Sequence, residues 1–387
     1  MAAFLDAVVA IWLAEAVLGT IAVWHYARAV RGGGVPPRFT APTAVIVPVR
    51  GAENLSRLLP ALRAQRFPDW RLIFAVEAES DPACPVLRQF VADAAGQPNA
   101  ELVVAGIAAD SGQKIHNQLA ALARLGPRDE IVAFADADIV PEPDWLARLV
   151  SPLGRDDVAV VSGWRWLVPA DGRLATAFVG AAHASFSLAP RPRAWALAWG
   201  GSMALRQHDL DRIDLRGAWR GAVLDDLRLT RAAWAHGGAV LGPSALLLRT
   251  PARYGWRDGA AFIRRQYLFI RIHMPRYWAL AAAAVTIPPL GWAAASAAIA
   301  TGRAWFALAF AAAIVLHQYR VSTRDYVARR LWGTSQDRRQ SLIERAAVPF
   351  WQLFHAALLW STAFGRTIRW GARAYRLDSD GKLRNGD

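Results

Sequence analysis

The sequence contains a single cysteine, Cys84, among its 387 residues. An internal disulfide is therefore impossible, and a structural zinc site built on several cysteines is excluded. Low-complexity segments and internal repeats are absent, apart from a general richness in alanine. No positively charged stretch precedes the first apolar run, which argues against a cleaved signal peptide and favours an uncleaved membrane anchor.

Acidic residues are also in the minority, with 31 Asp and Glu against 45 Lys and Arg and a formal net charge of +14. Such a balance is typical of proteins that meet nucleic acid, anionic lipid or phosphate-bearing ligands. The hydrophobic content is 54% and the mean hydropathy is +0.18, so membrane segments are expected. Because the arginines gather beside the apolar runs, we expect a membrane partner and no nucleic acid.

The first apolar run, residues 4–24, has about the length of the roughly 20 residues that a bilayer-spanning helix needs. Asp6 and Glu15 interrupt it. Four basic residues follow the run, namely His25, Arg28, Arg31 and Arg38. Since basic residues concentrate on the cytoplasmic side of membrane helices, we expect an anchor whose C-terminal end lies in the cytoplasm.

Three further apolar runs lie near the C-terminal end. Residues 277–300 are long enough to span a bilayer, and Pro288 and Pro289 are compatible with a kinked helix in a bundle. Residues 304–317 are short for a crossing unless the helix extends beyond its apolar part. Residues 346–364 have arginines on both flanks, and both flanks favour the cytoplasm. This last run is therefore predicted to be re-entrant or to lie in the membrane interface.

Between the apolar regions, short runs rich in valine and isoleucine alternate with helical patterns. The runs are too short for helices and have the composition of strands: 44–49, 71–76, 101–106, 131–135 and 158–163. Helical spacing of leucine and alanine recurs in segments 53–66, 85–95 and 113–125. This alternation predicts an α/β domain with a mainly parallel sheet and helices on its faces. Ligands of such sheets bind at the carboxyl ends of the strands.

Two aspartates one residue apart, Asp136 and Asp138, follow the fourth predicted strand directly. In extended backbone Ala137 points the other way, so the two carboxylates lie on one side at short range. A hard cation such as Mg²⁺ or Mn²⁺ typically takes one or two carboxylates together with substrate phosphates. The pair favours a metal and diphosphate site, and the alternative is a solvated turn before a helix that Asp144 helps to start.

Three other segments carry candidate ligand-binding residues. Glu77 and Glu79 follow the second predicted strand, where their side chains would bind a uracil or ribose. A plain acidic turn is the alternative. Lys114 stands at the start of a predicted helix, where a cation and free backbone amides favour a phosphate; a solvated lysine is the simpler alternative. Gly201 belongs to a pair of glycines that permits close approach of a ligand or forms a tight turn.

A second acidic pair, Asp225 and Asp226, begins another helical pattern. Acidic residues in that position stabilise a helix through its dipole and as caps. A carboxylate there also suits a general base, because the hydroxyl of a sugar acceptor is a poor nucleophile until its proton is taken.

A basic segment, residues 262–278, precedes the next apolar run. Basic residues at the cytoplasmic edge of a bilayer are expected without any further role. A second interpretation has Arg264 or Arg265 neutralising a departing diphosphate, with Tyr267 stacking in the same place.

In their order along the chain, these motifs resemble those of the GT-A inverting glycosyltransferases of family two, and within them the ceramide glucosyltransferase group. The resemblance spans nearly the whole chain, and its most specific matches are SDPA at 80–83, KIHN at 114–117, DADIVPEPDWL at 136–146 and RAYRL at 373–377. It implies a GT-A-like, Rossmann-like fold and a membrane enzyme that transfers a sugar from a UDP-sugar to a membrane lipid with inversion.

The resemblance also implies roles for individual residues. Asp226 would be the catalytic base with Asp225 beside it, and Asp136 and Asp138 would bind a divalent metal, Mg²⁺ or Mn²⁺. Nucleotide-sugar contacts would come from a wider set: Glu77, Glu79, Lys114, Asp136, Gly201, Arg264, Arg265, Gln266 and Tyr267. The chain departs from the family pattern at two places. Glu77 replaces the first aspartate, and Gln266 and Tyr267 take the places of Arg and Trp in the Q/R-x-x-R-W motif.

Four regions are predicted: a transmembrane anchor and basic linker (1–39), a GT-A domain (40–260), a basic juxtamembrane segment (261–276) and a C-terminal membrane region (277–387). The last region is expected to contain two spans, a re-entrant or interfacial helix and a basic tail. We expect a multi-pass protein of the inner membrane, with its catalytic domain in the cytoplasm, that acts as a UDP-sugar-dependent hexosyltransferase on a lipid acceptor. A processive polysaccharide synthase and a non-catalytic homologue that binds nucleotide-sugar or lipid are the alternative interpretations.

Overall fold

The computed structural model of the chain describes residues 2–31, 38–93, 98–189, 191–300, 302–370 and 373–384. Residues 32–37 of the predicted basic linker lie outside the described residues. The chain divides into two compact units. Unit 1 comprises Met1–Gly34, Leu167–Pro190 and Pro251–Arg366, and unit 2 comprises Val35–Trp166, Arg191–Thr250 and Thr367–Asp387.

Unit 2 is built on a seven-stranded sheet with the strand order β3-β2-β1-β4-β7-β5-β8. Its strands are β1 (Thr43–Pro48), β2 (Trp70–Val76), β3 (Asn99–Val104), β4 (Ile131–Ala135), β5 (Val160–Ser162), β7 (Ser202–Arg206) and β8 (Val240–Leu241). Strands β3, β2, β1 and β4 are parallel, whereas β7 runs antiparallel to both β4 and β5. The mainly parallel sheet predicted from the sequence is thus confirmed, and the five predicted strands correspond to β1 through β5.

Alternating side chains of the sheet separate two hydrophobic cores. In β1, Val45 and Val47 belong to one core and Ala44 and Ile46 to the other, because successive side chains of a strand point to opposite faces. Helices α2 (Leu55–Arg63), α3 (Ala83–Ala92) and α5 (Trp145–Val150) contribute to the first core. Helices α4 (Gln113–Leu122), α7 (Gln207–Arg212), α8 (Leu215–Trp219) and α9 (Asp226–Ala235) contribute to the second. A short 3-10 helix, η1 (Ser151–Gly154), follows α5.

Two small sheets accompany the large one. β6 (Trp164–Pro169) pairs with β9 (Leu247–Ala252). β10 (Thr367–Trp370) and β11 (Arg373–Arg376) form an antiparallel pair. The backbone N–H of Leu383 donates to the carbonyl of Gly221 (2.7 Å), so the C-terminal tail is attached to the loop that leads into α9.

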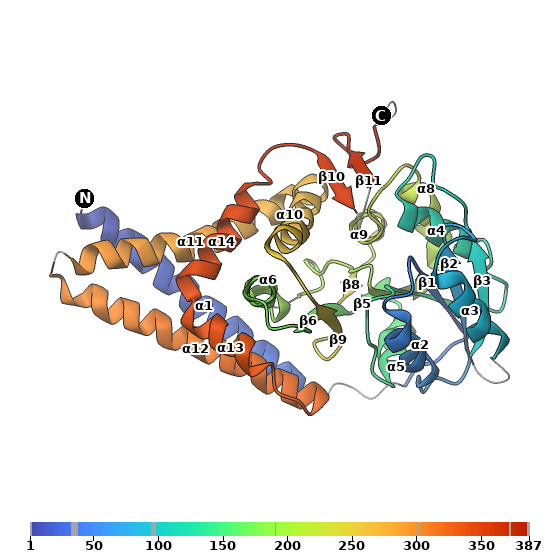
Figure 1. Cartoon of the computed structure of the whole chain (residues 1–387), viewed down its shortest axis with the longest axis horizontal. Coiled ribbons are helices and arrows are strands. Elements are labelled where there is room, and N and C mark those ends of the chain that lie inside the picture. Colours follow the sequence, from blue (N-terminus) through green and yellow to red (C-terminus); the bar gives the residue numbers. More distant parts are fainter. Residues whose placement is uncertain are drawn as a thin grey trace. The chain divides into compact units, whose positions relative to one another are not determined.

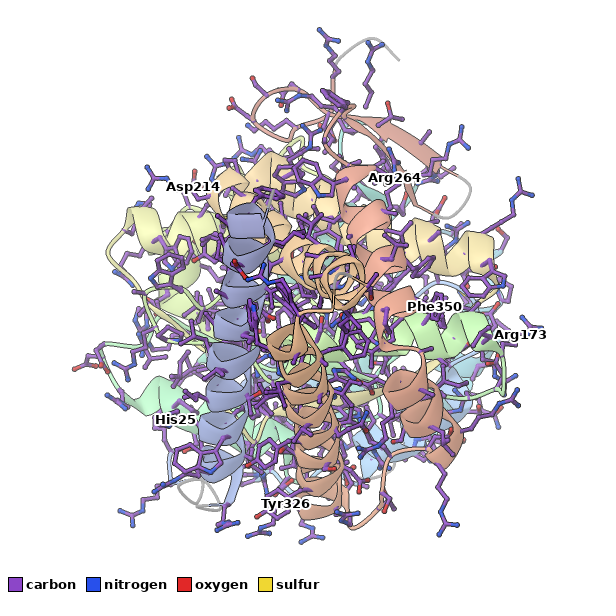
Figure 2. The ribbon with its side chains drawn as sticks, turned by 90° about the vertical axis from the view of Figure 1, so that its left-hand side faces the viewer. His25, Arg173, Asp214, Arg264, Tyr326 and Phe350 are labelled. Carbon is purple, nitrogen blue, oxygen red and sulfur yellow. The ribbon has the colours of Figure 1, made fainter. Side chains whose placement is uncertain are left out.

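Unit 1 is helical, and its described residues include three helices that are long and apolar enough to cross a membrane: α1 (Ala2–Arg31), α11 (Pro275–Ile299) and α12 (Ala304–Trp332). α12 continues well past its apolar part to Trp332, and the next residue, Gly333, adopts the left-handed conformation that favours glycine as a C-terminal cap. α1 lies alongside α12 (Figure 1). Figure 2 shows His25 of α1 and Tyr326 of α12 toward the same end of these helices, which therefore run in the same direction.

The acidic residues that interrupt the first apolar run have partners inside unit 1. Asp6 pairs with Arg303 (2.8 Å), and Glu15 lies 3.5 Å from Arg320. Four shorter helices complete the unit: α6 (Leu174–Ser187), α10 (Trp256–His273), α13 (Arg338–Ala346) and α14 (Val348–Trp360). α14 has 13 residues, fewer than the roughly 20 that a crossing needs, and its place in the membrane stays a prediction.

Candidate active site

The candidate site lies at the carboxyl ends of the parallel strands of unit 2. β4 ends at Ala135, and Asp136 and Asp138 follow it. The backbone N–H of Asp136 donates to the carbonyl of Gly201 (3.2 Å), just before the strand β7 that pairs with β4. The first acidic pair and the glycine pair, which are far apart in the sequence, are therefore neighbours in the fold.

Lys114 connects the two acidic pairs. It is the second residue of α4, and its Nζ lies 2.7 Å from Oδ1 of Asp136 and 2.9 Å from Oδ2 of Asp225. Burial disfavours the ammonium charge, but the carboxylates of Asp136 and Asp225 outweigh this effect and raise the pKa of Lys114 well above its usual value. Lys114 is thus a fixed positive charge between the two pairs and not a solvated surface lysine.

A second cation, Arg165 of β6, lies on the other side of the first acidic pair. Its Nη2 is 3.4 Å from Oδ2 of both Asp136 and Asp138. Burial opposes ionisation of Asp136, yet the charges of Lys114 and then Arg165 prevail and lower its pKa. For Asp138, burial and the neighbouring Asp136 charge prevail over Arg165 and raise the pKa. The two carboxyls are therefore in different electrostatic environments although they are one residue apart.

Asp225 is buried at the head of α9 and is held by several neighbours. Its Oδ2 accepts from Lys114 and from Nε2 of Gln118 (2.9 Å). Its backbone carbonyl accepts from Nε1 of Trp219 (3.0 Å). These bonds fix the position of the residue that directly precedes Asp226, so Asp225 is suited to holding the site in shape.

Asp226 occupies the first position of α9. Oδ2 accepts from the backbone N–H of Gly200 (3.0 Å), and Oδ1 from that of Leu227 (2.7 Å). Burial and the charge of Asp225 outweigh these bonds and raise the pKa of Asp226 to about 7. A carboxyl with this pKa takes up and releases a proton near neutral pH, which is the property that a general base requires.

The glycine pair lies against these charged groups. A Cβ atom at Gly200 would be 2.6 Å from Oδ2 of Asp225 and 2.8 Å from Nζ of Lys114. A Cβ atom at Gly201 would be 2.1 Å from the ring of Trp199. All three distances are below normal contact, so a side chain at either position would displace the neighbouring groups.

Glu77 and Glu79 lie in different surroundings, although both follow β2. Glu77 forms an ion pair with Arg373 of β11, and Nη1 of Arg373 also donates to Oε1 of Gln113 (2.7 Å) at the start of α4. Glu79 is exposed and pairs with Arg88 on the next helix. Glu77 therefore faces the C-terminal hairpin, and Glu79 faces solvent.

The predicted basic segment, 262–278, covers the larger, C-terminal part of α10 and the first residues of α11 in unit 1. The Tyr267 hydroxyl lies 2.6 Å from Nε2 of His355, and burial raises the pKa of this tyrosine. Nη2 of Arg264 donates to the carbonyl of Ser361 (3.3 Å), and the guanidinium of Arg265 lies over the ring of Phe262 at 5.8 Å. Gln266 is exposed.

Asp136 and Asp138 have the chemistry that a divalent cation requires. Both supply hard oxygen ligands, and Oδ1 of Asp138 is buried without a hydrogen-bond partner among the described residues. No group of three or more His, Cys, Asp or Glu side chains is placed to hold a metal within the part of the chain that the structure describes. Further ligands would therefore be substrate oxygens and water, which is the usual arrangement for Mg²⁺.

Several residues of the site were not predicted from the sequence. Gln118 lies four residues after Lys114, one helical turn along the same face, so helical spacing alone would have pointed to it. Arg165 and Gly200 have no comparable signal, since their roles depend on how β6 and β7 are placed. Arg373 was part of the recognised RAYRL segment, but nothing in that segment indicates a contact with Glu77.

The sheet and its flanking helices define the class of protein, a GT-A-like fold. A mannosyltransferase from Pyrobaculum calidifontis, PcManGT, solved with GDP-Man and Mn²⁺, is similar over 86% of this chain and 100% of its own, with a TM-score of 0.51 and 22% identity. TarS from S. aureus is similar over 59% of this chain and 40% of its own, with a TM-score of 0.37 and 15% identity. At these identities the likeness concerns the fold, and the GT-A assignment rests on the first structure.

The family follows from the sequence match. The model of glycosyl transferase family 21 matches residues 7–383, nearly the whole chain. The chain therefore belongs to glycosyl transferase family 21, the ceramide glucosyltransferase family, and the resemblance in its motifs is confirmed. With its three long apolar helices it is a membrane-associated glycosyltransferase. Among curated protein sequences none is significantly similar to it.

Proposed function

We propose that this protein is an inverting hexosyltransferase that moves one sugar from a UDP-sugar to the hydroxyl of a membrane lipid on the cytoplasmic face of the inner membrane. The observation that carries the proposal is Asp226, a carboxyl with a pKa near 7 held beside the cluster of Lys114 and Asp136. Family membership supports sugar transfer, and the apolar helices support a lipid acceptor.

The donor would bind across the carboxyl ends of β2 and β4. Glu77 would meet the nucleoside, and Lys114 and Arg165 would offset the negative charge of the diphosphate. Asp136 and Asp138 would hold a divalent metal, which when bound supplies positive charge to the diphosphate oxygens. The arginines of α10, Arg264 and Arg265, are further candidates for contact with the departing diphosphate.

The acceptor would be activated by Asp226. Its carboxylate takes the proton of the lipid hydroxyl as the hydroxyl oxygen attacks the anomeric carbon from the face opposite the nucleotide. The bond to the diphosphate breaks as the new bond forms, through a transition state with oxocarbenium character, and the anomeric configuration is inverted. The Gly200 N–H orients the base, and Asp225 with its partners holds the start of α9 in place.

A product assay tests the proposal. Purified protein is incubated with a panel of UDP-sugars, Mg²⁺ or Mn²⁺ and a total lipid extract, and mass spectrometry is used to find a lipid heavier by one hexose or hexosamine. Asp226→Asn should lower the rate by about 10² to 10⁴. Asp211→Asn is the matched control, because Asp211 is an exposed aspartate of the same unit whose carboxylate forms an ion pair with Arg216 at the surface (2.9 Å).

Two outcomes would contradict the proposal. UDP release without any glycosylated lipid would favour a protein that binds or hydrolyses the donor, and a ladder of products would favour a processive synthase. Near-normal turnover in the Asp226→Asn variant would show that the base lies elsewhere.

A further inference from the structure

Three arginines of unit 1 come together where α10 meets the end of α14, and we call them the arginine cluster: Arg264, Arg271 and Arg366. Arg264 and Arg271 lie two turns apart on one face of α10. Nη2 of Arg264 donates to the carbonyl of Ser361 (3.3 Å), and Nη2 of Arg271 donates to that of Gly365. Both side chains therefore reach the residues that follow α14, and Arg366 is the next residue of that segment.

Acidic side chains do not neutralise this cluster. Burial, and then the charges of Arg366 and Arg264, lower the pKa of Arg271, and no carboxylate in the described part of the chain opposes them. The hydrogen bonds of Arg264 and Arg271 go to backbone carbonyls, and neither residue forms an ion pair with another described residue. Because a carbonyl dipole offsets only part of a full charge, the cluster favours an anionic partner.

Other arginines of unit 1 have carboxylate partners. Arg303 pairs with Asp6 and Arg320 with Glu15, while Arg324 and Arg329 have carboxylate partners of their own. Basic residues at the edge of a membrane are expected whatever their role. Convergence of three arginines without a carboxylate is a more specific feature, and it distinguishes the cluster from this general background.

The arginine cluster lies at one end of a candidate membrane span. Arg271 is four residues before Pro275, with which α11 begins. Nε1 of Trp278, in the first turn of α11, donates to Oγ1 of Thr362 (3.0 Å), and its ring centroid is 5.6 Å from that of Trp360. Tryptophans are enriched at the boundary between membrane and water, where the lipid head groups lie. We therefore expect the cluster at head-group depth.

Exposed apolar side chains adjoin the cluster. Phe364, which directly precedes Gly365, is 86% exposed, and Trp360 at the end of α14 is 49% exposed. On α11, Leu280 is 53% exposed. A ligand that combines an anionic group with acyl chains matches both the arginines and this apolar surface. Free phosphate or a nucleotide matches the arginines alone.

We propose that the arginine cluster binds the phosphate of an anionic phospholipid, with Arg271 and Arg366 around the phosphate oxygens and the acyl chains along Trp360 and Phe364. Guanidinium groups suit this ligand, because their donors match phosphate oxygens in paired, charge-assisted hydrogen bonds. The lipid is a bound partner of unit 1 and takes no part in the proposed transfer reaction, so the site does not rest on that function.

Lipid binding to the full-length protein tests the proposal. The protein is purified in a neutral detergent and titrated with phosphatidylglycerol or with phosphatidylcholine of the same acyl chains. Native mass spectrometry counts the bound lipids, and neither donor nor acceptor is present. The first phosphatidylglycerol should bind about tenfold more tightly than the first phosphatidylcholine, the ratio that one charge-assisted hydrogen bond confers.

Matched variants localise this preference. Arg271→Gln combined with Arg366→Gln removes two charges of the cluster and should bring the ratio of the two affinities close to one. Arg330→Gln combined with Arg338→Gln removes two exposed arginines outside the cluster and should leave the ratio unchanged. Arg366→Gln alone, at an exposed position, should lower the ratio and serves where the first double variant fails to fold.

Competition separates the possible sources of the phosphate. Arg264 is also a candidate contact of the departing diphosphate, so the wild type with bound phosphatidylglycerol is titrated with UDP and with inorganic phosphate. Neither should displace the lipid at equal concentration, because neither carries acyl chains. Displacement by either one would overturn the proposal in favour of a site for soluble phosphate groups.

The wild-type ratio decides the matter even where a variant fails to fold, which size-exclusion chromatography reveals. Equal binding of the two lipids would overturn the proposal. An equal loss of preference in both double variants would overturn it as well, and would indicate unselective attraction to a basic surface. A lower melting temperature with an unchanged ratio would show that the arginines only hold the end of α14.

Discussion

Asp226 gives the site a pH dependence with a defined direction. Because burial and Asp225 raise its pKa to about 7, the carboxylate form of Asp226, which is the form proposed to act as the base, is scarce at pH 5 to 6 and abundant above pH 8. We expect kcat/KM for transfer to rise about tenfold per pH unit below about pH 7 and then to level off. Initial rates across pH 5 to 9 measure this, and a profile that is already flat at pH 5.5 would rule out Asp226 as the titrating base.

The same shift has a consequence for stability. The folded-state pKa of Asp226 lies above its ordinary value of 3.8, so folding takes up a proton between about pH 4 and pH 7. The stabilisation from that proton is complete below pH 4 and is lost as the pH rises through about 7. Asp226→Asn should therefore melt at a higher temperature than the wild type above pH 7, and the difference should shrink toward pH 4 in thermal scans of the same preparation.

Lys114 compensates several carboxylates at once. Lys114→Met would leave Asp136 and Asp225 close together without their shared cation, a change that typically costs about 3 to 5 kcal/mol at a buried pair. We expect a lower melting temperature and loss of donor binding. Adding Asp225→Asn to the variant should restore part of the stability, because one of the uncompensated charges is removed. A double variant no more stable than the single one would contradict this account.

Gly200 has no room for a side chain. Gly200→Ala would place a methyl group 2.6 Å from the Asp225 carboxylate, so we expect a loss of transfer activity larger than the loss of stability. Gly126→Ala is the matched control, since the nearest atom to its added Cβ, Oδ2 of Asp129, is 3.9 Å away, which is ordinary contact. Equal activities of the two variants would mean that the loop at Gly200 shifts to accommodate the methyl group with little loss of free energy.

At this scale the sequence was informative about residue types and uninformative about partners. Asp136, Asp138, Asp225 and Asp226 were recognisable because acidic pairs at the end of a strand or the head of a helix are unusual. Their cations were harder to assign. Lys114 had an equally simple interpretation as a solvated residue until the structure showed its Nζ between two carboxylates. That difference depends on tertiary contacts, which local patterns do not encode.

Among the elements, the C-terminal hairpin β10–β11 is placed to influence the donor. Arg373 of β11 pairs with Glu77 and bonds to Gln113, which together line the carboxyl end of β2 and the start of α4. If Glu77 binds the nucleoside, the ion pair with Arg373 fixes the orientation of the Glu77 side chain. Arg373→Gln should then raise the KM for the donor about tenfold, the effect of one lost charge-assisted bond, with a smaller change in kcat.

Two comparisons make this prediction specific. Arg369→Gln changes an exposed arginine of the neighbouring strand and should leave the KM unchanged. Glu77→Gln combined with Arg373→Gln should be no worse than either single change, because both remove the same interaction. Additive effects would show that the two residues act separately.

The strands were the part of the fold that the sequence predicted best. The five short apolar runs correspond to β1 through β5. β1, β2, β4 and β5 are buried, because a strand covered on both faces needs an apolar residue at nearly every position, whereas β3 lies at the edge of the sheet and is partly exposed. β7 was not predicted. Its sequence, SMALR, has weak strand character, and it forms because β4 and β5 both offer open edges for pairing. The contacts of the basic residues and of Tyr267 in α10 could not be predicted either, because helical periodicity does not indicate which residues pack against them.

For the whole molecule, the direction of the three long helices in the membrane decides on which side the proposed reaction takes place. α1 and α12 run in the same direction, and their C-terminal ends carry Arg28, Arg31, Arg329 and Arg330. Basic residues favour the cytoplasmic side, so the short connection between α11 and α12 is expected on the opposite side.

Thiol labelling in intact cells tests this orientation. The only native cysteine, Cys84, is buried, and Cys84→Ala provides a background without reactive thiols. In that background Ala300→Cys, at the end of α11, should react with a membrane-impermeant maleimide added on the outer side of the membrane. Ser335→Cys, in the exposed loop after α12, should react only once the membrane is permeabilised. The reverse pattern would place the arginine-rich ends outside, where no UDP-sugar is available, and the proposed reaction on the cytoplasmic face would then be untenable.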